Sequence, residues 1–116
     1  LLYRNNPPLN WCPPSGKLEN NESLITGLKR EVFEETGLKI NPIIPVDVWK
    51  GFHIDQPILS VTYVCFSKSN QVTLSDEHSE YIWLPIDELT TTNLSTDFEL
   101  KKWPSYIELA HFFSKD

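Results

Sequence analysis

The sequence predicts an α+β fold, a layered domain with one long helix, several short strands and a closing helix. Residues 22–36 have helical spacing of apolar side chains and no proline. Several stretches from residue 40 onward have the composition or the alternation of strands, and residues 104–114 form a second helical stretch that begins with a proline. Elements in this arrangement are typical of an α+β layered domain.

Two short strands are expected before the first helix. Residues 1–4 are apolar and strand-like, residues 5–10 carry turn-forming asparagines and prolines, and residues 11–12 precede a Pro-Pro pair that ends a second strand. The sequence opens within a strand pattern and contains no methionine. We therefore expect a single domain over residues 1–116 that lacks an N-terminal strand.

The first helix is expected over residues 22–36. Asn21 or Ser23 can serve as its N-cap, and Gly37 lies where a helix-terminating glycine belongs. Four apolar residues recur at helical spacing and predict a stripe that packs against the core: Leu24, Ile25, Leu28 and Val32.

The second half of the chain is predicted to be mostly strand. Residues 40–44 and 46–52 are rich in β-formers, with bends expected at the prolines, and residues 59–65 alternate as a half-buried strand does. Further elements are expected in this order: strands at 71–74 and 81–84, a helical turn at 86–89, a polar loop at 90–96 and the closing helix at 104–114.

Composition and charge exclude several kinds of protein. The apolar fraction of 40% is that of an ordinary globular domain, and no apolar run is long enough to cross a bilayer. A net charge of −6 argues against a nucleic-acid polymer as partner, since such binding needs a basic surface. Two cysteines, Cys12 and Cys65, are too few for a disulfide framework and indicate thiols in a cytoplasmic protein. An acidic protein that handles phosphate needs a divalent cation between the two.

Three glutamates of the first helix lie on the same side as its apolar stripe. With a turn of about 100° per residue, Glu31, Glu34 and Glu35 fall within an arc of about 100° that borders Leu24. Carboxylates crowded beside a buried face are unfavourable unless cations compensate them, and hard oxygen donors at this spacing suit Mg²⁺ or Mn²⁺. Arg30 lies four residues before Glu34 and can hold that carboxylate in orientation.

Gly27 lies on the same arc one turn earlier. A glycine inside a helix costs about 1 kcal/mol relative to alanine, so its presence here needs a reason. Our hypothesis is that the missing side chain lets the loop formed by residues 14–16 approach the cations.

Residues 16–38, GKLENNESLITGLKREVFEETGL, resemble the Nudix box, GX5EX7REUXEEXGU, in which U is a bulky aliphatic residue. Every fixed position of the motif is met, and residues 77–89 are similar to a later strand and turn of the same family. The resemblance to MutT-like Nudix hydrolases implies an α/β/α sandwich around a mixed sheet. It also implies Mg²⁺- or Mn²⁺-dependent hydrolysis of the diphosphate bond in a nucleoside diphosphate linked to another group.

The resemblance assigns roles to residues, position by position. The metal ligands it implies are Glu31, Glu34, Glu35 and the backbone of Gly16. Arg30, Glu34 and Glu35 form the implied catalytic set, in which one glutamate acts as base, together with a further acid from outside the motif. For that acid Glu80 is favoured over Glu77. Glu22 is a supporting residue. Apart from the resemblance, Lys17 and Arg4 are candidate substrate-binding residues, and for Lys17 a solvated position in the loop is the alternative.

Two positions depart from common family residues, and two alternative functions stay open. Ser15 stands where many members carry glycine, and Gly27 where alanine is common. One alternative is a non-catalytic nucleotide sensor with the same fold. The other is an isomerase acting on an isoprenoid diphosphate, which needs a reactive cysteine such as Cys12. The sequence does not identify the substrate, and it leaves open whether the chain forms a homodimer, as many relatives do.

The remaining chemistry-bearing side chains are assigned ordinary roles. The four tryptophans are expected mainly in the core, and the two cysteines are expected to pack as small apolar groups. His53, His78 and His111 are too scattered along the chain to suggest a metal cluster, so surface positions are expected for all three.

Overall fold

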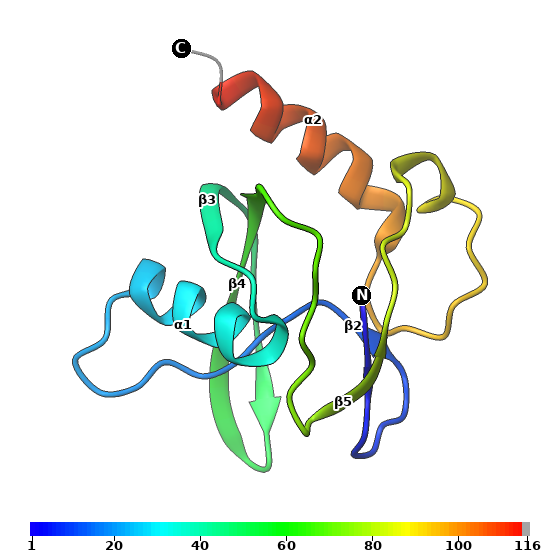
Figure 1. Ribbon diagram of the computed structural model, residues 1–116. Coiled ribbons are helices and arrows are strands. Elements are labelled where there is room, and N and C mark those ends of the chain that lie inside the picture. The colour runs from blue at the N-terminus through cyan, green and yellow to red at the C-terminus, as the bar shows by residue number, and fades with distance from the viewer. Residues whose placement is uncertain (115–116) are drawn as a thin grey trace.

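The computed structural model describes residues 1–114, apart from the side chain of His53, and arranges them as two sheets and two α-helices (Figure 1). The three-stranded sheet has the order β2-β1-β5. Its strands are β1 (Leu2–Arg4), β2 (Trp11–Cys12) and β5 (His78–Tyr81). The second sheet is the hairpin of β3 (Ile40–His53) and β4 (Gln56–Ser67). The helices are α1 (Leu24–Thr36) and α2 (Trp103–Phe113), and short 3-10 turns occupy Ile86–Glu88 and Leu100–Lys102.

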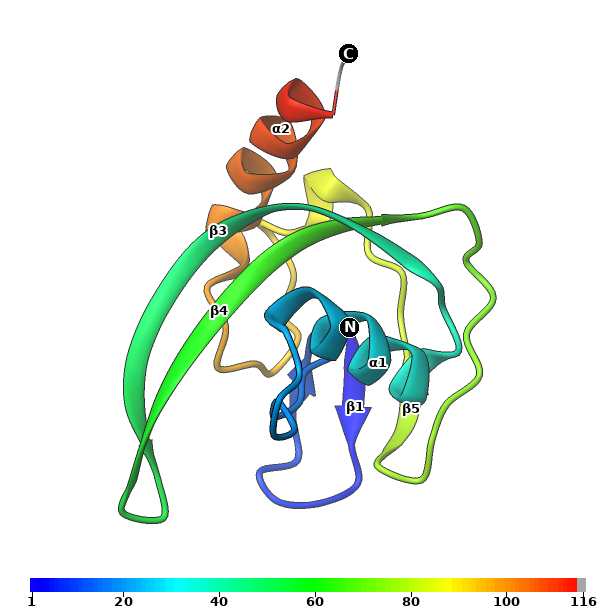
Figure 2. The same cartoon turned by 90° about the vertical axis from the view of Figure 1, so that its left-hand side faces the viewer.

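The two helices lie on opposite sides of the long hairpin. Figure 2 shows β3 and β4 as a curved arch, with α1 on its concave side and α2 on its outer side. Both helices contact β3. Strands within each sheet pair in antiparallel fashion, and an isolated parallel bridge joins Trp11 to Thr96. This arrangement confirms the predicted α+β class.

Helix α1 begins and ends where the capping residues predict. Ser23 Oγ accepts a hydrogen bond from the Thr26 N–H at 3.2 Å, and Gly37 adopts the left-handed conformation with a φ of 72°. The predicted apolar stripe is only partly covered, since Val32 is buried whereas Leu24 is 39% exposed. The N-terminal part of the stripe is therefore wrong as a core prediction, since Ile25 is exposed as well.

The later strands differ from the prediction in extent. β3 passes through both of its prolines as one strand, and the bends expected there are register shifts against β4, between Pro42 and Ile44 and between Pro45 and Asp47. Residues 71–74 are not a strand, and the strand predicted at 81–84 lies earlier. The position of β5 follows from its pairing with β1, in which Leu2 lies opposite Tyr81 and Arg4 opposite His78.

The closing helix is confirmed, with Pro104 in its first turn. The expectation that the tryptophans lie mainly in the core is wrong for Trp49 and Trp83, which are 46% and 54% exposed. Among the described residues, no helix has both the length and the apolar character that a membrane crossing requires.

Candidate metal and active site

The carboxylate of Glu35 is buried between α1 and the loop that precedes the helix. Its side chain comes from the last turn of α1, and the residue is 4% exposed. The backbone N–H of Ser15 donates to both carboxylate oxygens, at 3.2 and 3.3 Å. The loop thus approaches the helix through its main chain, which explains why a serine is accepted at this position.

Arg30 joins the other acids of the motif to the same loop. Its Nε and Nη2 donate to the two carboxylate oxygens of Glu22, at 2.6 and 2.9 Å. Its Nη1 donates to Glu31 at 2.8 Å and to Glu34 at 3.1 Å, and Nη2 also donates to the Lys17 carbonyl at 3.0 Å. The guanidinium beside Glu22 holds the pKa of that carboxyl at about 2. Arg30 therefore orients three carboxylates of the motif.

Two glycines make room for these contacts. A Cβ on Gly16 would overlap the carboxyl group of Glu31, so glycine lets this acid lie directly against the loop backbone. A Cβ on Gly27 would overlap Leu18 and come within 2.8 Å of Glu22 Oε1. The hypothesis that Gly27 admits residues 14–16 is therefore wrong, since its space is taken by Leu18 and Glu22, and the loop approaches at Gly16.

Substituting Gly16 by alanine is expected to displace the Glu31 carboxylate, because the added methyl group occupies its position. We expect Mn²⁺ to bind about tenfold more weakly, as for the loss of a group that orients a metal ligand. Electron paramagnetic resonance titration of free Mn²⁺ measures this change. Asn20→Ala, an exposed change in the same loop, serves as the control, and equal affinities for both variants would contradict the role given to Gly16.

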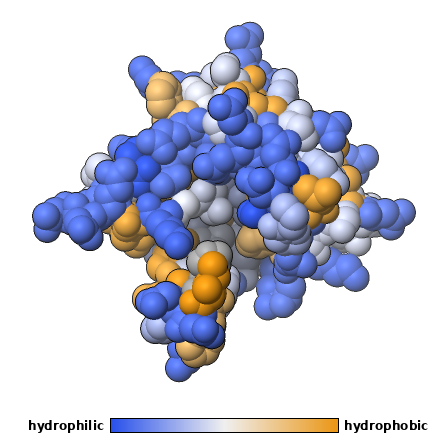
Figure 3. Space-filling model, turned by 90° about the horizontal axis from the view of Figure 1, so that it is seen from below, coloured by the Kyte–Doolittle hydropathy of each residue, from blue (hydrophilic) through white to orange (hydrophobic). Residues whose placement is uncertain are grey.

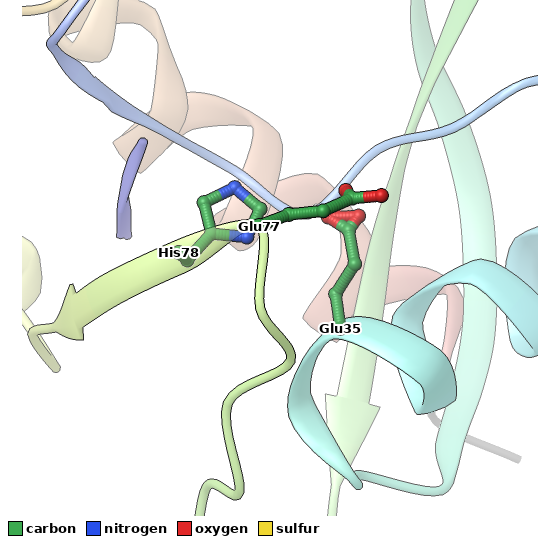
Figure 4. A group of neighbouring side chains, drawn as sticks. All are labelled: Glu35, Glu77 and His78. Atoms are coloured by element: carbon green, nitrogen blue, oxygen red, sulfur yellow. The ribbon is translucent and has the colours of Figure 1, made fainter. Parts of the chain in front are cut away.

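Two further side chains, from the first residue of β5 and the residue before it, meet Glu35. One ligand atom each from Glu35, Glu77 and His78 lies within 4.8 Å of the others, and Figure 4 shows the two carboxylates directed toward one another. Glu80, the acid favoured from sequence, is exposed on β5 opposite Tyr3 and is not in this group. The structure thus brings Glu77 rather than Glu80 to Glu35. The surface position expected for His78 is wrong, since this residue is 7% exposed.

These positions predict different effects of neutralising the two acids. We expect Glu77→Gln to reduce metal-dependent turnover by about tenfold or more, and Glu80→Gln to change it less than about twofold. Steady-state rates at saturating Mg²⁺ for both variants decide between them. A larger loss of turnover in Glu80→Gln than in Glu77→Gln would support Glu80, the acid that the sequence favoured.

A cavity of about 270 Å³ opens beside this group. Figure 3 views the molecule from below and shows a hollow bordered mainly by hydrophilic residues. The lining residues come from β1, its following turn, β2, the loop, α1 and β5: Arg4, Asn6, Cys12, Ser15, Glu35, Glu77 and His78. Arg4 is thus at the cavity, whereas Lys17 is not among the lining residues and meets Arg30 through its carbonyl.

Burial controls the protonation of the groups at this cavity. Burial, against the lowering effect of the hydrogen bond from Ser15 and with the help of the neighbouring carboxylates of Glu77, Glu31 and Glu34, raises the pKa of Glu35 to about 7. Such a site favours a bound cation, because a cation compensates the charge that burial and neighbouring acids make unfavourable. The oxygen donors on α1 also match the preference of Mg²⁺ and Mn²⁺.

The Cys12 thiol lacks the environment of a reactive cysteine. Burial raises its pKa, and the positive charge of Arg4 offsets this only in part. A thiol that stays protonated is a poor nucleophile, so the structure gives no support to the isomerase alternative.

Comparisons with known proteins agree on one family. The family model described as NUDIX domain matches residues 1–107. A MutT-like protein of Streptomyces ambofaciens is 31% identical over 80 residues, which cover 69% of this chain and 51% of that protein. The asymmetrical bis(5'-nucleosyl)-tetraphosphatase of Rattus norvegicus is 30% identical over 97 residues, covering 76% of this chain and 64% of the relative. The chain therefore spans 51% and 64% of the length of these two curated relatives.

Two solved structures share the fold. A MutT protein from Methanosarcina mazei Go1 superposes with a TM-score of 0.71 at 24% identity, covering 99% of this chain and 83% of that one. A binary complex of an Ap4A hydrolase from C. elegans gives a TM-score of 0.63 at 18% identity, with coverages of 97% and 78%. At these identities the likeness concerns the fold.

Proposed function

The chain belongs to the NUDIX domain family, and from this premise we propose that it is a pyrophosphohydrolase that cleaves a phosphoanhydride bond in a small nucleotide derivative. The observation that carries the proposal is the position of Glu35. Its buried carboxylate lies between the loop backbone and Glu77, at the wall of a cavity of about 270 Å³. A sensor that only binds nucleotides does not require a carboxylate held in this unfavourable place.

We assign the α1 acids, with Glu77, to the binding of divalent cations. Glu31 lies against Gly16, Glu34 is held by Arg30, and Glu35 is held by the Ser15 N–H. A bound cation supplies charge neutralisation at the phosphoryl oxygens and a lower pKa for the attacking water.

The other residues of the site orient groups and move a proton. Arg30 contacts one oxygen of Glu34, whose side chain is 56% exposed, so the second oxygen can accept the proton of the attacking water. Glu22 fixes Arg30 through two hydrogen bonds. Arg4 is the cationic residue at the cavity and can donate to a phosphate of the substrate.

For the substrate, the names of the relatives suggest dinucleoside polyphosphates as the first class to test. Two of the matched proteins are named asymmetrical bis(5'-nucleosyl)-tetraphosphatases. The open, polar cavity suits a phosphate chain better than an apolar group. We therefore propose that a dinucleoside tetraphosphate is cleaved into a nucleoside triphosphate and a monophosphate.

A panel of nucleotide substrates tests the proposal. The panel contains a dinucleoside tetraphosphate, nucleoside triphosphates, ADP-ribose and a nucleotide sugar, each with Mg²⁺, with Mn²⁺ and with a chelator. We expect metal-dependent product from the dinucleotide, resolved by ion-exchange chromatography. Product from another nucleotide would retain the hydrolase and change its substrate. Nucleotide binding without product from any of them would favour the sensor.

The state of the two cysteines agrees with a reducing compartment. Cys12 and Cys65 are both free thiols, and burial raises the pKa of Cys65 to about 11. On this ground we propose a cytoplasmic location.

A further inference from the structure

His78 is a buried imidazole at the cavity wall to which the proposed reaction gives no role. Its Nε2 lies 3.8 Å from Sγ of Cys12, a residue of β2, which is the other outer strand of the three-stranded sheet. Its Nδ1 is buried and has no hydrogen-bond partner in the part of the chain that the structure describes. A buried polar atom without a partner is unfavourable, so such an atom indicates a group that binds there.

The ring faces the two carboxylates at the cavity. The ligand atoms of Glu35, Glu77 and His78 all lie within 4.8 Å of one another, and they come from two separate elements, α1 and the start of β5 (Figure 4). Ligand atoms about 2.1 Å from a common cation are at most about 4.2 Å apart. The limit of 4.8 Å is slightly wider than this spacing, and Glu77 is exposed, so its side chain has room to adjust.

The contact with Cys12 leaves Nδ1 free to act as a ligand. Nδ1 can bind a cation when the proton of the neutral ring lies on Nε2, and in that tautomer Cys12 Sγ can accept a weak hydrogen bond from Nε2–H. The lone pair of Nδ1 then faces the cavity. The outer nitrogen of a metal-binding histidine is commonly fixed in this way by a neighbouring group.

We propose that His78 Nδ1 is a nitrogen ligand for a divalent cation that Glu35 and Glu77 also hold. This inference rests on the proposed function, because it concerns the same cavity, and it adds a donor of different chemistry to the acids of α1. Mg²⁺ prefers oxygen donors, whereas imidazole suits later first-row metals. The site should therefore favour Co²⁺, Zn²⁺ and Mn²⁺ over Mg²⁺ more strongly than an all-carboxylate site does.

The direct test uses Mn²⁺ alone, without any substrate. Electron spin echo envelope modulation of Mn²⁺ bound to metal-stripped protein detects nitrogen nuclei in the coordination shell. We expect a ¹⁴N modulation that changes to the ¹⁵N pattern when the protein is labelled with [¹⁵N]histidine. We also expect it to vanish in His78→Gln, whose amide can replace Nε2 toward Cys12 but supplies no counterpart of Nδ1. His111→Gln, which changes an exposed histidine of α2, should keep the modulation.

The outcomes separate this inference from the proposed function. Bound Mn²⁺ without nitrogen modulation in the wild type overturns the role of His78 and leaves the hydrolase in place. Failure of Mn²⁺ to bind at all overturns both. Modulation that persists in His78→Gln shows another nitrogen source and overturns the assignment. If that variant does not fold, the isotope comparison shows whether the nitrogen belongs to a histidine, and modulation kept in both His53→Gln and His111→Gln assigns it to His78, whereas its loss in either variant overturns the assignment.

Metal selectivity gives a second readout. We expect His78→Gln to weaken Co²⁺ binding by about tenfold or more and Mg²⁺ binding by less than about threefold, by analogy with the loss of groups that tune a metal site. Isothermal titration with each metal alone measures both constants. Equal losses for the two metals would contradict a nitrogen ligand.

Discussion

Glu35→Gln is expected to remove nearly all metal-dependent hydrolysis while the fold survives. The amide has the shape of the carboxylate, and its oxygen can still accept the hydrogen bond that the Ser15 N–H donates. The amide lacks the negative charge at the cavity. In the wild type, one ligand atom of Glu35 lies within 4.8 Å of a ligand atom of Glu77 and of one of His78. Loss of this ligand should lower the rate by about 10²-fold or more, because cation binding and water activation both depend on it.

Rates with the best substrate of the nucleotide panel, at saturating Mg²⁺ and Mn²⁺, measure this loss. Circular dichroism of each variant reports whether the fold is kept. Glu108→Gln, an exposed change of the same kind on α2, is the matched control and should behave as the wild type. Turnover within about threefold of the wild type in Glu35→Gln would refute the assignment of Glu35, since the smallest effect expected for a lost ligand is larger.

The features of the site that are local in sequence were predictable. The ends of α1 follow from Ser23 and Gly37, which act on hydrogen bonds within a few residues. The contact between Arg30 and Glu34 is also local, because residues four apart are neighbours on a helix. Side chains at such spacings are placed by helix geometry alone, so no tertiary information is needed.

The features that depend on strand pairing were not predictable in the same way. Glu77 and Glu80 are equally acidic and lie three residues apart, and the choice between them depends on where β5 begins. That start is determined by the pairing of Arg4 with His78, residues that are 74 positions apart in the printed numbering. The burial of His78 follows from the same pairing, which is why the spacing of the histidines gave no indication of it.

Helix geometry also could not predict which residues lie against a glycine. The helical arc that contains Gly27 was identified from sequence. The residues that lie against Gly27, however, are Leu18 and Glu22, which come from the segment before α1. Gly16, for which the resemblance implied a backbone contact to the metal, is the residue whose lack of a side chain admits Glu31. A helical wheel shows which face a residue occupies, whereas the loop conformation decides what that face meets.

A second large effect is expected in the metal-free protein, which should lose stability as the pH rises from about 4.5 to about 7. The folded-state pKa of Glu35, about 7, lies above its ordinary value of 4.5 because the carboxylate is buried. Between these pH values the folded state binds more protons than the unfolded state. The free energy of unfolding therefore falls as the pH rises. A full shift of this size corresponds to about 3 kcal/mol.

Comparison with Glu35→Gln isolates this contribution from other titrating groups. Burial lowers the pKa of His78, which acts in the opposite direction below 6.5, and the lowered pKa of Glu22 matters only below about 4.5. Both groups remain in the variant. We expect wild type and variant to have similar stability at pH 4.5, and the variant to be more stable by about 1 to 3 kcal/mol at pH 8. Urea denaturation with a chelator at several pH values measures the difference, with the exposed change Glu108→Gln on α2 as control.

Adding metal should reverse the order of stability of wild type and Glu35→Gln at pH 8. A ligand that binds only the folded state stabilises it by about 2.7 kcal/mol at a hundred times its dissociation constant. At pH 8 wild type should gain this amount with Mn²⁺, while Glu35→Gln, which lacks the ionised carboxylate, gains much less. The same buried charge then destabilises the empty protein and stabilises the loaded one. A stability difference that does not change with pH, or an equal gain with Mn²⁺ in both proteins, would show that Glu35 does not face the cation.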